Sequence, residues 1–179
     1  MFKKKLNKRD DEELTVNDAN IILEYCEKYF NFRPLTSWFD TFDYFIKLFG
    51  NSSYYDDSCI NLDLVQWATS PKWKGIPPKI KTKHLNNDLP IIKHLLEKNF
   101  ETIFFNGKTV VENLTEYLNI NLAKKTTVFK YKNGTEKRLE IFSGNYNKVK
   151  IIGWNLYLQN AITGNENLEL LNNIIKSNI

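Results

Sequence analysis

The sequence predicts an α/β fold, with a small parallel sheet flanked by helices and an added β-hairpin. Amphipathic helical patterns alternate with short apolar runs of strand length. One such run, Ile103-Phe104-Phe105, ends in Asn106-Gly107 and leads into a helical pattern, which is the order that builds parallel sheets. Two alternating segments flank Asn133-Gly134, a strong signal for a hairpin turn.

The length of 179 residues favours one domain with a substantial core. Residues 1–13 combine lysines with an acidic run and predict a flexible arm, so we expect a single domain over residues 14–179. No apolar run approaches the roughly 18 to 20 residues that span a bilayer. The basic start Met-Phe-Lys-Lys-Lys is not followed by an apolar segment, so we expect no secretory signal and a cytoplasmic protein.

Five helices follow from apolar periodicity and capping residues. Thr15 and Asp18 resemble a capping box, with Asp in place of the usual Glu, and predict a helix that continues to Tyr29. A third helix is expected to begin at Asn87 or Asp88, with Pro90 in its first turn. The other expected helices are Trp38 to Phe49, capped by Ser37, Lys108 to Leu118, and about Asn167 to Lys176.

Five strands complete the predicted fold. They are Cys59 to Val65, Ile103 to Phe105, Thr126 to Tyr131, Lys137 to Phe142 and Val149 to Gly153. The first of these is the expected centre of the sheet, and it carries Asp63 inside an otherwise apolar run. A carboxylate in a buried strand costs several kcal/mol (about 3 to 5 when unpaired), so Asp63 is either satisfied by structural partners or displayed to a ligand. Ligands of open α/β sheets bind at the carboxyl ends of strands, which makes Asp63 the first candidate site residue.

Cysteine and histidine are too scarce and too scattered for the usual metal-binding spacings. The chain has Cys26, Cys59, His84 and His94, and we expect no metal, no disulfide and no cofactor.

Two spans without acidic residues combine lysines with aromatic side chains. Leu64 to Asn87 holds Lys72, Lys74, Lys79, Lys81 and Lys83 together with Trp67 and Trp73, and Ile141 to Asn165 holds Lys148, Lys150, Tyr146, Trp154 and Tyr157. Cations neutralise phosphates and ring faces stack on bases, so this pattern favours nucleic-acid binding. The alternative is a solvated lysine-rich surface in a chain where lysine is abundant.

Three segments in order resemble the uracil-DNA glycosylase superfamily. They are Asn61 to Thr69 (Asn-Leu-Asp-Leu-Val-Gln-Trp-Ala-Thr), Phe105 to Val110 (Phe-Asn-Gly-Lys-Thr-Val) and Ile152 to Gln159 (Ile-Gly-Trp-Asn-Leu-Tyr-Leu-Gln). The resemblance covers about residues 29–162 and is closest to a bacterial glycosylase-like branch. It implies a small parallel sheet flanked by helices, DNA binding, base flipping, and hydrolysis of the N-glycosidic bond by water without a cofactor.

The resemblance assigns roles to residues of this chain. Asp63 occupies the place of a pocket asparagine that reads the base edge, and Asn155 lies in the loop that supplies a catalytic histidine in the family. An ionised aspartate only accepts hydrogen bonds, which matches the exocyclic amine of cytosine better than uracil. The other implied residues are Tyr54, Tyr55, Trp67 and Asn106 for the base, Tyr157 or Leu158 as an intercalating wedge, and Lys72, Lys74, Lys148 and Lys150 for phosphates.

The family's first strand, which positions the attacking water, has no counterpart in residues 1–28. Two functions therefore remain open at this point. One is a DNA glycosylase, as in DNA repair, that excises a cytosine-type, modified or unmodified, base. The other is an inactive glycosylase-like module that binds DNA or protein, for example in antiviral defence, with another chain supplying the strand.

Overall fold

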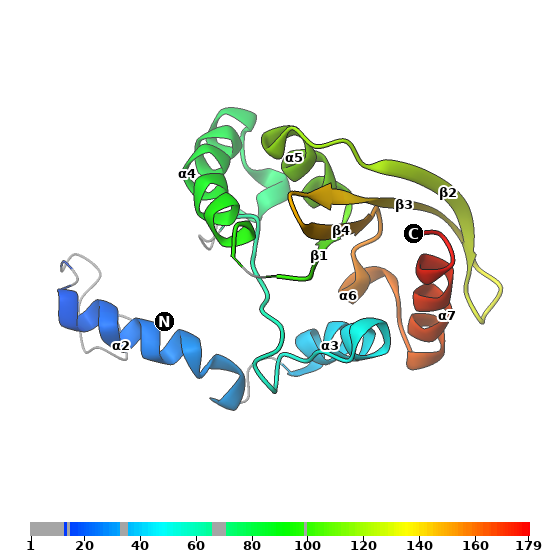
Figure 1. The fold of residues 1–179 in the computed structure, drawn as a ribbon, viewed down its shortest axis with the longest axis horizontal. Helices are drawn as coiled ribbons and strands as arrows, with labels where there is room; N and C mark the ends of the chain where they lie inside the picture. Colours follow the sequence, from blue (N-terminus) through cyan, green and yellow to red (C-terminus); the bar gives the residue numbers. More distant parts are fainter. Residues whose placement is uncertain (1–12, 14, 33–35, 66–70, 99) are drawn as a thin grey trace. The chain divides into compact units, whose positions relative to one another are not determined.

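The structure, a computed structural model, describes residues 13, 15–32, 36–65, 71–98 and 100–179 (Figure 1). The chain divides into two compact units, Met1–Asp40 and Thr41–Ile179, which are described separately. None of the helices in the described ranges combines the length and the apolar character needed to cross a membrane.

The first unit contains α2 (Val16–Glu27), η1 (Tyr29–Phe32) and the first turn of α3 (Thr36–Gly50). The predicted capping box is confirmed, because the backbone N–H of Thr15 donates to Asp18 Oδ2 at 2.7 Å and Thr15 Oγ1 accepts from the Asp18 N–H at 3.3 Å. Beyond this helix, Tyr29, Phe30 and Phe39 meet edge to face, with ring centroids 5.1 to 5.9 Å apart.

The second unit is built on a four-stranded mixed sheet in the order β1-β4-β3-β2. Its strands are β1 (Thr102–Asn106), β2 (Ala123–Lys130), β3 (Glu136–Tyr146) and β4 (Val149–Trp154). The α/β class and the β2–β3 hairpin agree with the sequence prediction. The expectation of a parallel sheet is corrected, because only β1 and β4 run parallel while β2, β3 and β4 pair antiparallel.

The predicted central strand, Cys59 to Val65, is wrong: these residues have no strand structure. An apolar run forms a strand only where a neighbouring edge can accept it with both faces satisfied. Here Asn61 and Asp63 alternate with apolar residues and both stay exposed, so pairing this segment inside the sheet would bury two polar side chains on one face.

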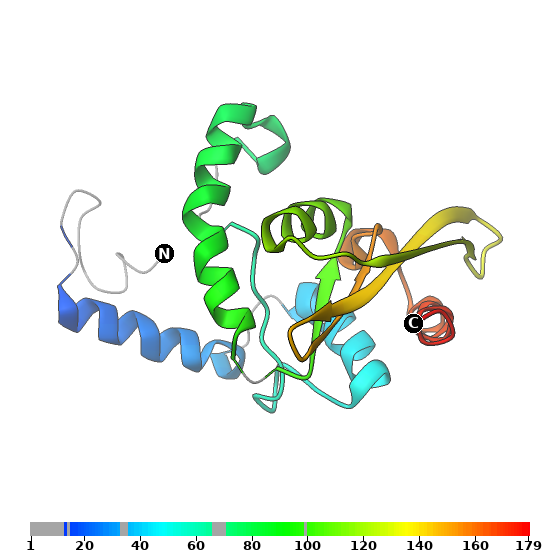
Figure 2. The same ribbon diagram turned by 45° about the horizontal axis from the view of Figure 1, so that its top comes forward.

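Helices cover both faces of the β1–β4 pair, with α4 (Pro78–Leu96) and α5 (Lys108–Leu118) on one face and the remainder of α3 on the other (Figure 2). The unit also contains η2 (Trp73–Gly75), α6 (Leu158–Ala161) and α7 (Asn165–Lys176). α4 begins far earlier than expected. Pro78 at its start replaces a backbone N–H that needs no helical partner, and Pro90, expected in the first turn, lies inside the helix instead.

The core has one layer on each side of β1 and β4. On one side, Phe105 and Ile151 pack with Leu89 and Ile92 of α4 and Val111 of α5. On the other side, Phe42, Phe45 and Phe49 of α3 lie against Phe104 and Trp154, with ring centroids 5.0 to 6.4 Å apart. These two layers fix the position of the strand ends at which the candidate site lies.

Candidate functional site

The carboxyl ends of β1 and β4 bring two predicted site segments together. Asn106 pairs with Trp154 in the parallel register, and the backbone N–H of Gly107 donates to the Trp154 carbonyl at 3.0 Å. From this edge the chain enters α5 after β1 and α6 after β4. The side chains that follow each strand are therefore neighbours, although about fifty residues separate them in sequence.

The side-chain amide of Asn106 organises this edge. Its Oδ1 accepts hydrogen bonds from Trp154 Nε1 at 3.0 Å and from the backbone N–H of Leu158 at 3.1 Å. Its Nδ2 donates to Gln159 Oε1 at 2.8 Å. Both acceptor positions of the oxygen are used, and among the described residues the amide nitrogen donates one hydrogen bond, to Gln159. The side chain of Asn106 therefore supports the fold of this edge.

Gly107 allows Tyr157 to come close to the end of β1. Gly107 has φ +104°, a conformation that other residues rarely adopt. A Cβ atom placed on it would lie 3.2 Å from Cδ2 of Tyr157. The tyrosine ring thus lies directly over the backbone turn between β1 and α5.

Asp63 lies within electrostatic reach of Tyr157. The residue is exposed, yet the surrounding chain partly desolvates its carboxyl group and raises the pKa of Asp63. The pKa of Tyr157 is also raised, first by burial and then by the charge of Asp63. Two residues that the sequence singled out, one from the 59–65 segment and one that follows β4, therefore lie within electrostatic range of each other.

Tyr54 lies within electrostatic range of Tyr157. Its side chain is buried, and the pKa of Tyr54 is raised first by that burial and then by the charges of Cys59, Asp43 and Tyr157. The Tyr54 hydroxyl makes a long hydrogen bond of 3.5 Å to Asn61 Oδ1. Burial on this scale makes Tyr54 part of the packing.

Asp43 of α3 positions the loop that carries Tyr54, a role that sequence reasoning missed. Asp43 Oδ1 accepts from Ser53 Oγ at 2.7 Å and from the backbone N–H of Tyr54 at 2.8 Å. Asp43 Oδ2 forms an ion pair of 2.8 Å with Lys47 Nζ. The signal in the sequence was an acid inside the broad apolar stripe of α3, which is rare unless the acid has partners.

The side-chain amide of Asn155 is engaged with β3. Asn155 Oδ1 accepts from the backbone N–H of Glu140 at 2.9 Å, and Nδ2 donates to the Arg138 carbonyl at 3.1 Å. These bonds continue the β3–β4 pairing beyond the last strand residue. The catalytic role that the resemblance assigned to Asn155 stays a prediction.

The remaining aromatic and apolar candidates differ in exposure. Tyr157 is 38% exposed, whereas Leu158 is fully buried, so of the two wedge candidates only Tyr157 reaches the surface. Tyr55 is exposed, and Lys47 Nζ lies 5.8 Å from the centre of its ring. Trp67 lies outside the described residues.

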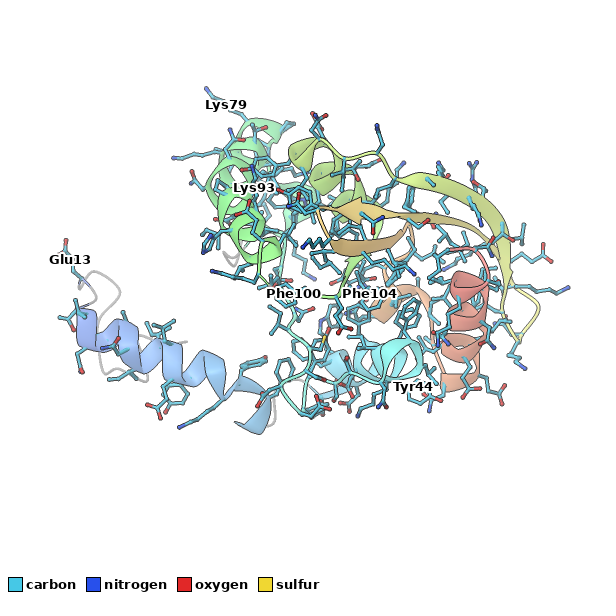
Figure 3. The ribbon with its side chains drawn as sticks, viewed as in Figure 1. Glu13, Tyr44, Lys79, Lys93, Phe100 and Phe104 are labelled. Atoms are coloured by element: carbon cyan, nitrogen blue, oxygen red, sulfur yellow. The ribbon has the colours of Figure 1, made fainter. Side chains whose placement is uncertain are left out.

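The candidate phosphate-binding lysines lie in two separate places. Lys72 and Lys74 are exposed on either side of Trp73, whose ring has Lys81 Nζ 5.7 Å from its centre, and Lys79 projects from the start of α4 (Figure 3). Lys148 and Lys150 are exposed at the amino end of β4, where Lys150 pairs with Thr102. Four residue steps of roughly 3.3 Å each, about 13 Å in all, separate Lys150 from Trp154 along β4.

Comparison of the chain with protein-family models, curated proteins and solved structures found no match. Within the described part of the chain, no three His, Cys, Asp or Glu side chains gather as a metal site.

Proposed function

We propose that this chain is a DNA glycosylase-like protein that flips a cytosine-type base out of DNA and hydrolyses its N-glycosidic bond. The observation that carries the proposal is that Asp63 lies within electrostatic range of Tyr157, whose ring lies against the Gly107 turn at the carboxyl end of β1. A carboxylate and a half-exposed ring in one region of the surface offer a hydrogen-bonding edge and a stacking face, which are the two contacts that a flipped base needs.

Asp63 supplies the base selectivity in this proposal. Its ionised carboxylate accepts a hydrogen bond from the exocyclic amine of cytosine, a group that uracil lacks. Because the pKa of Asp63 is raised, its protonated form persists to higher pH than for an ordinary aspartate. As the pH falls, activity that needs the carboxylate should therefore be lost at a higher pH than an unperturbed aspartate would give.

Tyr157 and the first group of lysines supply the contacts to DNA. Tyr157 fills the space of the flipped base or stacks on it, since its ring is exposed over the Gly107 turn. Lys72 and Lys74 neutralise phosphates, with Trp73 between them. These contacts hold the nucleotide, while its own phosphates stabilise the positive charge that develops on the sugar.

The bond chemistry requires one water molecule. The bond between the sugar C1′ and the base nitrogen breaks, and its electron pair leaves with the base. The water oxygen bonds to C1′, and the proton that it releases returns to solvent or to the departing base. Positioning that water against C1′ supplies the remaining rate enhancement.

A binding module without activity is the second candidate. The amides of Asn106 and Asn155 favour it, because each already bonds to other parts of the chain. In that case Asp63 and Tyr157 bind a nucleotide or a protein segment without chemistry.

Incubation with oligonucleotides tests the proposal. The substrates carry cytosine, hydroxymethylcytosine, glucosylated hydroxymethylcytosine or uracil, and alkali then cleaves each abasic site. We expect cleavage at a cytosine-type base with the unmodified chain and its loss with Asp63→Ala. Asp57→Asn is the matched control, because Asp57 is an exposed carboxylate at φ 61°, a conformation that asparagine tolerates well. If no base is released from any substrate, the glycosylase proposal fails and the binding-module proposal takes its place.

A further inference from the structure

The β2–β3 hairpin continues beyond the end of β4. β4 pairs with residues 141–146 of β3, whereas β2 pairs with β3 from residue 136 onward. Among the described strands, residues 136–140 therefore have residues 126–130 of β2 as their only partner. We call this two-stranded extension, with the turn that joins it, the ribbon (residues 126–140). Its tip, drawn in yellow, projects past β4 in both views (Figure 1 and Figure 2).

The ribbon leaves the sheet at the carboxyl end of β4, next to the candidate site. The first residue of β3 that pairs with β4 is Ile141, and its partner is Trp154. One residue further, the backbone N–H of Asn155 donates to the Glu140 carbonyl at 3.2 Å. The base of the ribbon is thus attached to the chain two residues before Tyr157.

One face of the ribbon is packed and the other is open. Phe129 and Leu139 are fully buried, and the Tyr131 hydroxyl donates to the carbonyl of Ala161 in α6. Side chains alternate between the two faces of a strand, so the even-numbered residues lie on the opposite face. Val128 on that face is 57% exposed. The packed face holds the ribbon in place, and the open face is exposed to a partner.

The ribbon and the two residues before it carry a strong positive charge. Residues 124–140 contain six basic and two acidic residues, a formal excess of four positive charges. This excess equals the formal net charge of the whole chain, +4. All six basic side chains are exposed, namely Lys124, Lys125, Lys130, Lys132, Lys137 and Arg138. By its charge, this surface fits a polyanion.

The acids of the ribbon neutralise only part of this charge. Glu140 forms ion pairs with two cations, Lys124 Nζ at 2.7 Å and Arg138 Nη2 at 2.8 Å. Lys130 Nζ lies 3.6 Å from Glu136 Oε1, and pairs between exposed side chains contribute little to stability. The basic residues of this segment without an ion pair in the described ranges are Lys125 and Lys137. Phosphates can therefore take up these cations at little cost to the fold.

A ribbon of this shape and charge fits duplex DNA. The major groove is about 12 Å wide and admits a two-stranded β-ribbon, and phosphates line both of its sides. On the open face, Thr126 and Val128 offer a hydroxyl and an apolar group of the kind that contacts base edges. Lys130 and Arg138 on the same face offer cations for phosphates. A single strand presents no such groove.

We propose that the ribbon lies in the major groove of duplex DNA, with Lys130 and Arg138 neutralising phosphates. This inference rests on the DNA binding in the proposed function. It adds a second contact surface for DNA and a preference for the duplex over a single strand. DNA held by the ribbon lies next to the edge that carries Tyr157.

Fluorescence anisotropy of the full chain over a range of salt concentrations tests the inference. The probes are a fluorescein-labelled DNA duplex and one of its strands alone. The test variant is Lys130→Ala with Arg138→Ala. The matched control is Lys148→Ala with Lys150→Ala, which removes the same charge from the amino end of β4. A third variant, Lys130→Arg with Arg138→Lys, keeps both charges.

For the duplex, the test variant should flatten the slope of log affinity against log salt by about 1.8, which is about 0.9 for each of two phosphates. Its slope for the single strand should change little, and the other two variants should behave like the unmodified chain. An unchanged slope for the duplex would overturn the inference. So would an equal loss on the single strand, in the control or in the variant that keeps both charges.

Two further measurements separate this inference from its alternatives. If poly-glutamate competes as well as unlabelled duplex at equal charge, the ribbon is a site for acidic proteins and the inference fails. Base release in the alkali assay reports on the glycosylase itself. Base release together with an unchanged duplex slope in the test variant overturns the ribbon contact alone, whereas no binding of either DNA by the unmodified chain overturns both proposals.

Discussion

The two ends of the β1–β4 pair are built in different ways. At the carboxyl end, one amide side chain joins β1 to Trp154, Leu158 and Gln159, and a glycine at positive φ lets Tyr157 approach. At the amino end, Lys148 and Lys150 are exposed around a turn that uses Asn147 at φ 54°. The same two strands thus end in a connected polar network on one side and in an ordinary charged turn on the other.

This difference predicts that substitutions at the carboxyl end destabilise the fold more than substitutions at the amino end. A buried donor that loses its acceptor costs more than the bond contributed, so the Asn106 network constrains several segments at once. Exposed lysines at a turn contribute little to stability. The carboxyl end is therefore the place where the fold and the proposed site depend on the same residues.

Replacing Asn106 by alanine should give the largest loss of stability. Trp154 Nε1 and the Leu158 N–H would both lose their acceptor, which costs about 2 to 4 kcal/mol in the free energy of unfolding. Urea denaturation measures the loss as a lower midpoint at an unchanged slope. Asn106→Asp keeps the acceptor and should lose only about 1 kcal/mol, and Lys150→Ala should stay within about 0.5 kcal/mol. Equal stability of Asn106→Ala and Lys150→Ala would contradict the claim that the carboxyl end contributes more to stability than the amino end.

Gly107→Ala should cost less, about 2 kcal/mol, through its strained backbone and the contact with Tyr157. The matched control is Gly134→Ala, because Gly134 also has positive φ but no atom within 4 Å of the added Cβ. We expect about 1 kcal/mol for the control, and the excess at Gly107 should disappear in a Tyr157→Ala background. Thermal or urea unfolding of the four variants gives this comparison, and an excess that survives Tyr157→Ala would place the clash elsewhere.

The two groups of lysines should differ in DNA binding. Changing Lys72 and Lys74 to alanine should flatten the dependence of log affinity on log salt by about 0.9 for each phosphate that is no longer neutralised. The same change at Lys148 and Lys150 should leave the slope nearly unaltered, since these residues lie at the far end of β4. Fluorescence anisotropy over a range of salt concentrations measures both. A larger change in the slope for Lys148 and Lys150 would indicate that DNA binds at the amino end of β4 instead.

The smallest expected effect is on the pH dependence of stability. Because the pKa of Asp63 is raised above its usual 3.8, the folded chain holds this proton more tightly than the unfolded chain. The stabilisation is present at low pH and is lost as the pH rises through the raised pKa. The stability of the unmodified chain relative to Asp63→Asn should thus fall slightly between about pH 3 and pH 6. A difference that rises over this window would mean that Asp63 is held by a cation.

Local patterns in the sequence predicted most elements of this fold, and the exceptions have physical causes. The bounds of α5 match the prediction, because Gly107 and an amphipathic pattern mark them. The 59–65 strand fails because an apolar run does not reveal whether a neighbouring edge can accept it. α4 was predicted too short because a proline usually marks a first turn, and tertiary packing of Leu89 and Ile92 supports Pro90 inside the helix.

The sequence predicted which residues belong to the candidate site, but it did not predict the contacts between them. Asp63 and Tyr157 stand out because an acid within an apolar run and an aromatic at a strand end are unusual. Their proximity, and the role of Asp43 in holding the Tyr54 loop, depend on packing between segments far apart in sequence. Spacing along the chain carries no record of such contacts.

The most direct test of the proposed function is the ratio of release rates for cytosine-type bases and uracil, with the unmodified chain and with Asp63→Asn. The two side chains are nearly the same size, and the asparagine amide restores a donor for uracil. A good edge contact is worth about 1 to 3 kcal/mol, so the ratio should shift toward uracil by about five- to a hundredfold. An unchanged ratio would make Asp63 a structural residue, and release of no base by either protein would contradict the enzyme.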